Sequence, residues 1–135
     1  MIYSEKFNYK TTSKTVDSAL EIDEAREITN VLVGFVQVEK EDEANQKYIE
    51  TKLIKNLKWA ARKNDTNNIL LHSFAHLSNS KASIDFTKQV FDNVEERISK
   101  TDYEVSQTPF GYFLDLDFKA PGKSLARMFK DINVK

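Results

Sequence analysis

The stretch Val31-Leu32-Val33-Gly34-Phe35-Val36-Gln37-Val38 decides how the rest of the sequence is interpreted. It is a nearly continuous run of β-branched and aromatic residues, which is typical of a central strand buried on both faces of a sheet. A strand buried in this way must be covered by neighbouring elements, so the flanking sequence is expected to supply helices or further strands.

The sequence after this strand changes to a helical period. Its apolar positions recur at intervals of three or four residues, which predicts an amphipathic helix of about 18 residues. The positions that define its buried face are Gln46, Ile49, Leu53, Leu57 and Ala60. Residues 64–68 carry turn chemistry and end this helix.

A second strand and a second helix follow. Residues 69–71 together with His72 predict a buried strand, and residues 74–80 predict the loop after it. Ser83 is a suitable N-cap for a helix. The buried face of that helix comprises Phe86, Val90, Val94 and Ile98.

The two ends of the chain add further strands and a short helix. Residues 2–10 predict an N-terminal strand, whereas residues 11–29 leave open a second short strand followed by an irregular or helical stretch. Later segments predict a strand at 103–105, a turn at 108–111, an alternating strand at 112–118, a break at 120–122 and a short helix at 124–132. We therefore interpret residues 1–135 as one α/β (α+β) domain with a mixed β-sheet, two longer helices and a short C-terminal helix.

The composition restricts the classes of function. The 135 residues carry a formal net charge of −1 and contain no cysteine, which excludes a general duplex-binding protein, disulfides and thiolate chemistry. No stretch reaches the apolar length of a membrane-spanning helix, and residues 1–6 lack a signal pattern. We expect a cytoplasmic protein that does not engage a membrane.

The two histidines and a pair of aspartates each have a functional and a structural interpretation. His72 and His76 lie four positions apart, but they span a strand end and a loop, so a metal site is disfavoured. His76 stays a candidate acid, base or substrate contact. Asp115 and Asp117 share a strand face that could hold a cation but is more often simply solvated.

Two cationic rows could meet phosphate groups, although each is more often a solvated face. One row comprises Lys123, Arg127 and Lys130, and the other comprises Lys55, Lys58 and Arg62. The segment Gly122-Lys123-Ser124 is not a phosphate-binding loop, because Asp117 stands where that loop requires its first glycine. These signals alone indicate an α/β domain without assigning it a function.

Three segments together resemble the editing domain at the N-terminus of archaeal threonyl-tRNA synthetases. Residues 31–40, which end in Val38-Glu39-Lys40, are similar to a core strand of that family. The segment Phe74-Ala75-His76-Leu77-Ser78 resembles its loop motif, and Thr108-Pro109-Phe110-Gly111-Tyr112 resembles its proline-phenylalanine-glycine-aromatic turn. The segments occur in the family's order, and the pattern continues without a gap from 107 to 132.

The resemblance implies a D-aminoacyl-tRNA deacylase-like fold, a homodimer, and hydrolysis of seryl-tRNA mischarged on threonine tRNA. It implies no metal or other cofactor, much main-chain contact with the substrate, and as partners the aminoacylated tRNA 3′ end and a synthetase catalytic chain. The catalytic candidates are His76, Lys123 and Arg127: the resemblance implies His76, and the two cations stand at departures from the family. The substrate-binding candidates are Ser4, Phe74, Ala75, Ser78, Pro109, Phe110, Gly111, Tyr112, Phe113 and Leu114.

The sequence departs from the family at the positions of two active-site side chains. Leu114 stands at the position of an active-site lysine, and Arg127 stands at that of a glutamate. Leucine cannot donate a hydrogen bond to a carbonyl or an oxyanion, so whether the chain is an enzyme stays open. Lys123 and Arg127 are candidates to replace the lost lysine.

Three functions are therefore compatible with the sequence. The first is editing with a changed site, which makes the chain an aminoacyl-tRNA deacylase. The second is a catalytically lapsed module that binds a tRNA end or a nucleotide, and the third is a dimerisation or partner domain of a threonyl-tRNA synthetase system. The sequence does not decide which aminoacyl ester is accepted, or whether the domain is free-standing.

Overall fold

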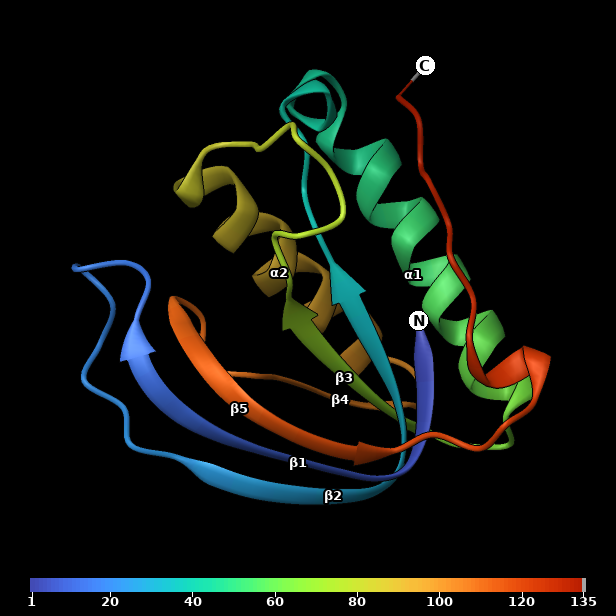
Figure 1. Cartoon of the computed structure of the whole chain (residues 1–135). Coiled ribbons are helices and arrows are strands. Elements are labelled where there is room, and N and C mark those ends of the chain that lie inside the picture. The colour runs from blue at the N-terminus through green and yellow to red at the C-terminus, as the bar shows by residue number, and fades with distance from the viewer. Residues whose placement is uncertain (135) are drawn as a thin grey trace.

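A five-stranded sheet forms one layer and two helices form the other in the computed structural model, which describes residues 1–134 (Figure 1). The strands are β1 (Ile2–Lys14), β2 (Ala25–Val36), β3 (Asn68–Ser73), β4 (Glu104–Gln107) and β5 (Tyr112–Lys119). The helices are α1 (Gln46–Lys63) and α2 (Ile84–Ser99), with short 3-10 turns η1 (Lys40–Ala44) and η2 (Ser124–Ala126). Among the described residues, neither helix is long and apolar enough to cross a membrane.

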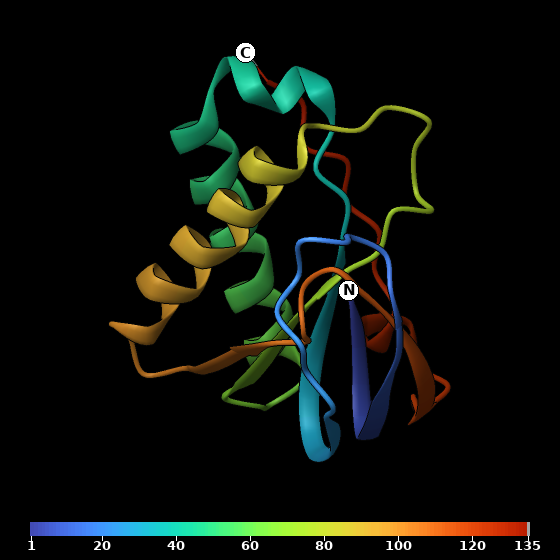
Figure 2. The ribbon, with the colours of Figure 1, turned by 90° about the vertical axis from the view of Figure 1, so that its left-hand side faces the viewer.

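The sheet is mixed, as predicted, and its strand order is β4-β3-β2-β1-β5. Strand β1 pairs antiparallel with both β2 and β5, whereas β2–β3 and β3–β4 are parallel pairs. Parallel neighbours need a crossover connection, and α1 and α2 supply the two that this order requires. Figures 1 and 2 show both helices on one side of the sheet.

The run 31–38 is buried from both sides, as its composition predicts. Leu32 belongs to the core between the sheet and the helices, whereas Val31 and Val33 pack with Phe7 and Tyr9 in a second cluster. All five side chains are at most 2% exposed. This two-sided burial explains why the central strand lacks the apolar–polar alternation of a half-buried strand.

Gly34 lets helix α1 approach β2 closely. A Cβ atom at this position would lie 2.8 Å from Cδ2 of Leu57, which is fully buried on α1. Real Cβ atoms essentially never make so short a contact, so a side chain here would force the Leu57 side chain to shift in a close-packed core. Gly34 therefore leaves room for Leu57 between two elements that line the cavity described below.

Both predicted helices are confirmed, and polar side chains cap their N-termini. The amide of Tyr48 donates to Oδ1 of Asn45 at 3.3 Å, and the amide of Phe86 donates to Oγ of Ser83 at 3.1 Å. Each bond satisfies an amide that has no partner within its helix. The predicted N-cap role of Ser83 is thus confirmed.

The C-terminal helix differs from its prediction, whereas residues 11–29 fit theirs in part. Strand β1 continues to Lys14, residues 15–24 are irregular, which is one of the two alternatives predicted there, and β2 already begins at Ala25. The predicted helix 124–132 is reduced to η2, and residues 127–134 contain no helix. Main-chain hydrogen bonds between Met1 and Met128 tie this segment to β1, so its backbone groups bond to another strand instead of to a helical turn.

Substituting Gly111 by alanine is expected to lower the free energy of unfolding by about 1–3 kcal/mol. Gly111 has a φ of +85°, and an added Cβ would lie 3.0 Å from the Cβ of Ala19. Chemical denaturation would measure the loss. Gly122→Ala is the matched control, because its Cβ would have no neighbour within 4 Å. An equal effect of both substitutions would contradict a special role for the backbone at Gly111.

Candidate functional site

A cavity of about 850 Å³ lies beside the C-terminal end of β2. Its lining includes Phe35 of β2, Gln37 just after that strand, and Leu116 and Phe118 of β5. Helix α1 adds Ile49, Leu53, Asn56 and Leu57, the loop after β3 adds Phe74, Leu77 and Ser78, and the C-terminal segment adds residues 127–132. A volume of this size matches that of sites that take small molecules or a nucleotide-sized group.

The side chain of Gln37 holds the loop 74–80 from inside. Its Nε2 donates to the carbonyl oxygens of Ser78 at 2.9 Å and Ser80 at 2.8 Å. Its Oε1 accepts from the amides of Leu77 at 2.7 Å and Ser78 at 2.8 Å. These four bonds use every donor and acceptor of the side-chain amide, so Gln37 fixes the loop backbone in one shape.

Further hydrogen bonds fix the rest of this loop. Oγ of Ser78 donates to Oε1 of Glu39 at 2.6 Å, and the amide of Ser80 donates back to Oγ of Ser78 at 3.0 Å. The amide of Phe74 donates to the carbonyl of Val36 at 3.0 Å. The loop is therefore preorganised against the chain that follows β2 before any ligand arrives.

Aromatic rings connect the sheet to the tip of the loop. Phe35 contacts the rings of His72 and Phe74 edge to face, with centroid distances of 5.2 and 5.4 Å. The ring of Phe74 in turn lies 4.9 Å from that of His76. His76, which is exposed, is thus supported from below by packed aromatic rings rather than by a hydrogen bond that assigns it a proton.

His72 is a buried part of this aromatic packing and does not face solvent. Its side chain is 6% exposed, and its Nδ1 lies 3.0 Å from Oγ1 of Thr108. Burial lowers the pKa of His72 to about 4, so the imidazole is neutral at physiological pH. Within residues 1–134, no three imidazole or carboxylate groups lie close enough together to hold a metal ion.

The structure brings several predicted site residues to the same loop and cavity. Phe74, Ser78 and Arg127 line the main cavity. Ala75 and His76 line a shallower depression on the outside of the loop, which Ser78 shares. The loop 74–78 is therefore one wall common to both hollows, and Arg127 lies in the main one.

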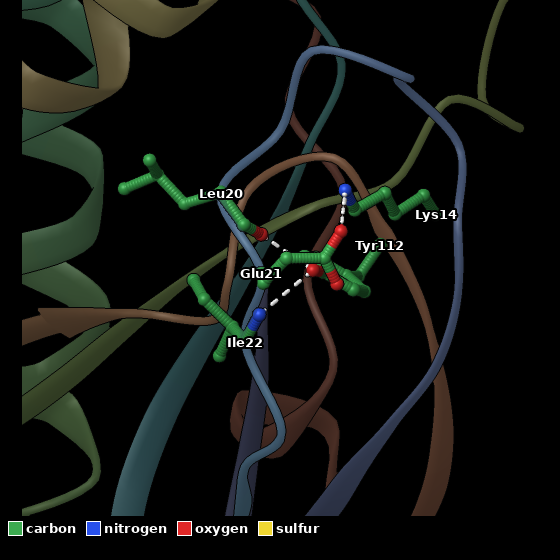
Figure 3. A network of polar contacts seen from close by, with 5 residues as sticks. All are labelled: Lys14, Leu20, Glu21, Ile22 and Tyr112. Atoms are coloured by element: carbon green, nitrogen blue, oxygen red, sulfur yellow. Dashed lines mark hydrogen bonds and ion pairs between the residues drawn. The ribbon is translucent and has the colours of Figure 1, made fainter.

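The turn at 109–114 lies elsewhere, and none of its residues lines either hollow. The carbonyl of Gly111 accepts from the amide of Thr15 at 2.7 Å. Figure 3 shows the hydroxyl of Tyr112 donating to the carbonyl of Leu20 and accepting from the amide of Ile22 at 2.9 Å, beside the Lys14–Glu21 ion pair. In this chain, the turn anchors the connection between β1 and β2.

The remaining residues of the turn also make structural contacts or lie exposed. Pro109 is half-buried, and Phe110 packs on Phe91 of α2 with centroids 6.1 Å apart. Leu114 packs against the second core cluster, whereas Phe113 is exposed. Their predicted contacts with a substrate stay predictions.

Ser4 and Lys123 also lie outside the cavity lining. Ser4 is fully buried, and its hydroxyl has no hydrogen-bond partner among the described residues. The ammonium group of Lys123 lies 5.8 Å from the centroid of the Tyr3 ring. Lys123 is therefore held near the start of β1 by a cation–π contact.

Sequence patterns did not predict the roles that three residues have in this site. Gln37 and Glu39 reach a loop some 40 positions away through side-chain hydrogen bonds. Phe118 lines the cavity from β5, although its strand predicts only an alternating pattern. A single glutamine at a strand end forms no recognisable sequence pattern. The loop to which the side-chain amide of Gln37 bonds is therefore known only from the folded chain.

Changing Gln37 to glutamate is expected to loosen the loop, because a carboxylate cannot donate to the two serine carbonyls. We expect amide hydrogen exchange in residues 74–80 to rise by at least about tenfold, corresponding to a local loss of about 1.5 kcal/mol or more. Gln89→Glu on α2 is the matched control. Unchanged exchange in Gln37→Glu would show that another contact holds the loop.

The sequence and the fold are both similar to those of known proteins. Residues 1–132 match the model of the archaea-specific editing domain of threonyl-tRNA synthetase. A threonine–tRNA ligase of Methanosphaera stadtmanae is 31% identical and covers 100% of this chain and 22% of that protein. One from Thermococcus sibiricus is 30% identical and covers 98% of this chain and 22% of its own length. The chain thus spans about a fifth of these relatives.

A solved structure shares the fold at low sequence identity. The c-Myc DNA unwinding element binding protein superposes with a TM-score of 0.59 over 87% of both chains, at 11% identity. At this identity the likeness carries the fold alone. It confirms the predicted D-aminoacyl-tRNA deacylase-like arrangement of a mixed sheet with two helices.

Proposed function

The chain belongs to the family of archaea-specific editing domains of threonyl-tRNA synthetase, and from this premise we propose that it hydrolyses mischarged seryl-tRNA(Thr). The substrate is the aminoacylated 3′ end of threonine tRNA. Serine lacks only the methyl group of threonine, and one such group changes binding by only about 1–3 kcal/mol. A separate hydrolytic site is the usual remedy for so small a difference.

The observation that supports this proposal best is the cavity bounded by the loop 74–80 and by Arg127. The loop is fixed by Gln37 before any ligand binds, as a site that acts through main-chain groups requires. Within residues 1–134, the amides of Ala75 and His76 donate to no other protein group, unlike those of Phe74, Leu77 and Ser78. These two amides remain available to a ligand in the depression on the outside of the loop, which Ala75 and His76 line.

The reaction needs one water molecule. Its oxygen attacks the ester carbonyl carbon, the bond to the ribose oxygen breaks, and a proton is delivered to that oxygen. In the proposal, the guanidinium of Arg127, which lines the main cavity, stabilises the negative charge that develops on the carbonyl oxygen. His76 positions the substrate or moves the proton, and Lys123 attracts a phosphate of the tRNA end.

A non-catalytic binding module is the second candidate, and Leu114 favours it. The family's lysine position is occupied by an apolar side chain that packs against the cluster of Phe7, Tyr9 and Val33. A pocket can keep its shape when such a donor is lost, while the rate falls by about a hundredfold or more. In that case the chain would bind a tRNA end or a nucleotide without turnover.

The proposal extends to the setting in which the domain works. We propose a homodimer in the cytoplasm that acts with a threonyl-tRNA synthetase catalytic unit, on the same chain or on a separate one. The support is the family membership and the likeness to threonine–tRNA ligases over the whole of this chain. Light scattering of the purified domain would measure the oligomeric state directly.

Binding of a non-hydrolysable analogue tests the location of the site. A 3′-serylamino-adenosine, in which an amide replaces the ester, should perturb the NMR amide signals of residues 74–78 and 127–131. Perturbation there without turnover of the ester would favour the binding module. Perturbation confined to other surfaces would contradict the proposed site, and no response at all would leave only the partner-domain function.

A further inference from the structure

The charges of this nearly neutral chain are segregated between its two helices. Helix α1 carries six cationic side chains and a single carboxylate, Glu50. That carboxylate is 5% exposed and accepts hydrogen bonds from Gln46 and Asn93, so it faces α2 rather than solvent. Helix α2 has the opposite balance, with four carboxylates and two cations. The net charge of −1 therefore conceals one strongly basic surface.

The cations of α1 form a row together with two aromatic rings. Positions 48, 52, 55, 59 and 62 follow intervals of four and three, which places them on one face of an α-helix. We call this face the α1 row, and it comprises Tyr48, Lys52, Lys55, Trp59, Arg62 and the adjoining Lys63. Lys58, which the sequence pattern groups with Lys55 and Arg62, instead lies 5.6 Å from the ring of Tyr103.

Two of the four cations of the α1 row lie over the aromatic rings of the same row. The ammonium of Lys52 lies 5.7 Å from the ring centroid of Tyr48, and that of Lys63 lies 5.9 Å from that of Trp59. Within residues 1–134, none of the four cations of this row forms an ion pair. Four unneutralised cations on one face raise the local positive potential, which attracts a polyanion.

The α1 row adjoins the cavity described above. Leu53 and Asn56, on the neighbouring stripe of α1, line that cavity, and so does Lys130 of the C-terminal segment. Figure 1 shows the C-terminal segment passing along α1. A chain of phosphates lying on the row would therefore end beside the cavity.

We propose that the α1 row is the surface that holds the phosphate backbone of the RNA whose 3′ end enters the cavity; this inference rests on the proposed function. The row is about 20 Å long, enough for several phosphates of one strand. Its cations match phosphates in charge, and its rings provide faces on which an unpaired base can stack. The row lacks the broad exposed apolar face that insertion into a lipid surface would need.

Trp59 is the sole tryptophan of the chain and reports on this row without a label. We would titrate the natural chain with an RNA hairpin that carries an acceptor-like stem and a single-stranded 3′ end. The test variant is Lys52→Gln/Lys55→Gln/Arg62→Gln, and the control Lys6→Gln/Lys10→Gln/Lys100→Gln removes the same charge from other exposed positions.

The proposal predicts that the hairpin changes Trp59 fluorescence and that the test variant binds at least about tenfold more weakly. The slope of log affinity against log salt should fall by about 2 to 3 in that variant. The control should bind within about twofold of the natural chain. Equal losses of RNA binding in both variants, or no RNA binding by the natural chain, would overturn the proposal. So would a test variant that binds the hairpin as tightly as the natural chain does but no longer binds phosphatidylserine vesicles.

A minimal substrate separates this inference from the proposed function. The seryl ester of adenosine has no stem, so the test variant should hydrolyse it at the natural rate while its KM for seryl-tRNA(Thr) rises about tenfold. If neither ester is hydrolysed by the natural chain, the proposed reaction fails and the hairpin titration still decides the role of the row. If the natural chain hydrolyses both esters and the KM for seryl-tRNA(Thr) is unchanged in the test variant, the role proposed for the α1 row is wrong and the proposed reaction stands.

Discussion

Replacing Arg127 by alanine is expected to slow hydrolysis of seryl-tRNA(Thr) by about a hundredfold, chiefly in kcat. The side chain lines the cavity, and its Nη2 donates a long hydrogen bond of 3.4 Å to the carbonyl of Ala120. A cation that lies in the cavity stabilises the negative charge that develops on the ester oxygen. Single-turnover deacylation with radiolabelled serine would measure the rate.

The control for this substitution is Arg97→Ala on α2, whose guanidinium bonds to Thr51 away from the cavity lining. It should leave the rate within about twofold. Arg127→Lys keeps the charge but loses the planar guanidinium, so we expect an intermediate rate. If Arg127→Ala hydrolyses seryl-tRNA(Thr) at the natural rate, Arg127 has no part in the mechanism, and the main-chain amides of the loop become the remaining candidates.

Acidification between pH 6.5 and pH 4 is expected to destabilise the protein through His72, by up to about 3 kcal/mol in total. Burial lowers the pKa of His72 in the folded state to about 4, whereas the unfolded chain has the ordinary value of 6.5. The unfolded state therefore binds the proton first as the pH falls. The contribution of His72 to stability is complete above pH 6.5 and is lost progressively down to about pH 4.

Denaturation curves of the natural chain and of His72→Gln over this pH range would isolate the effect. The difference in unfolding free energy between them should change by roughly 1.4 kcal/mol per pH unit in the affected window. Glutamine keeps a polar partner for Thr108, so the variant is expected to fold. His76→Gln is the control, since that side chain is exposed, and parallel curves for His72→Gln and the natural chain would show that burial does not exclude the proton.

Periodicity determines much of this fold and little of its site. The interval pattern from Gln46 to Ala60 predicted α1 because burial of one helical face imposes it. The unbroken run 31–38 predicted the central strand for the corresponding reason. The failed prediction was the helix 124–132, where Met1 and Met128 bond across 127 positions and a local pattern cannot anticipate the pairing.

The site depends on contacts of this distant kind. Gln37 meets its loop only after β2 and β3 pair in parallel, and Arg127 reaches the cavity only because the C-terminal segment pairs with β1. The motif residues Phe74 and Ser78 do line the cavity, whereas the turn 109–114 anchors the β1–β2 connection. The motif thus marked a loop that borders the cavity, but it did not reveal which parts of the motif face the hollow.

Deacylation of seryl-tRNA(Thr) by this chain, with threonyl-tRNA(Thr) as the control substrate and Leu114→Lys alongside, decides whether the chain is an editing enzyme. We expect selective loss of the seryl ester with the natural chain, with the threonyl ester spared. No turnover by the natural chain, together with a gain in Leu114→Lys, would contradict the proposed reaction and show a retained pocket that no longer catalyses it.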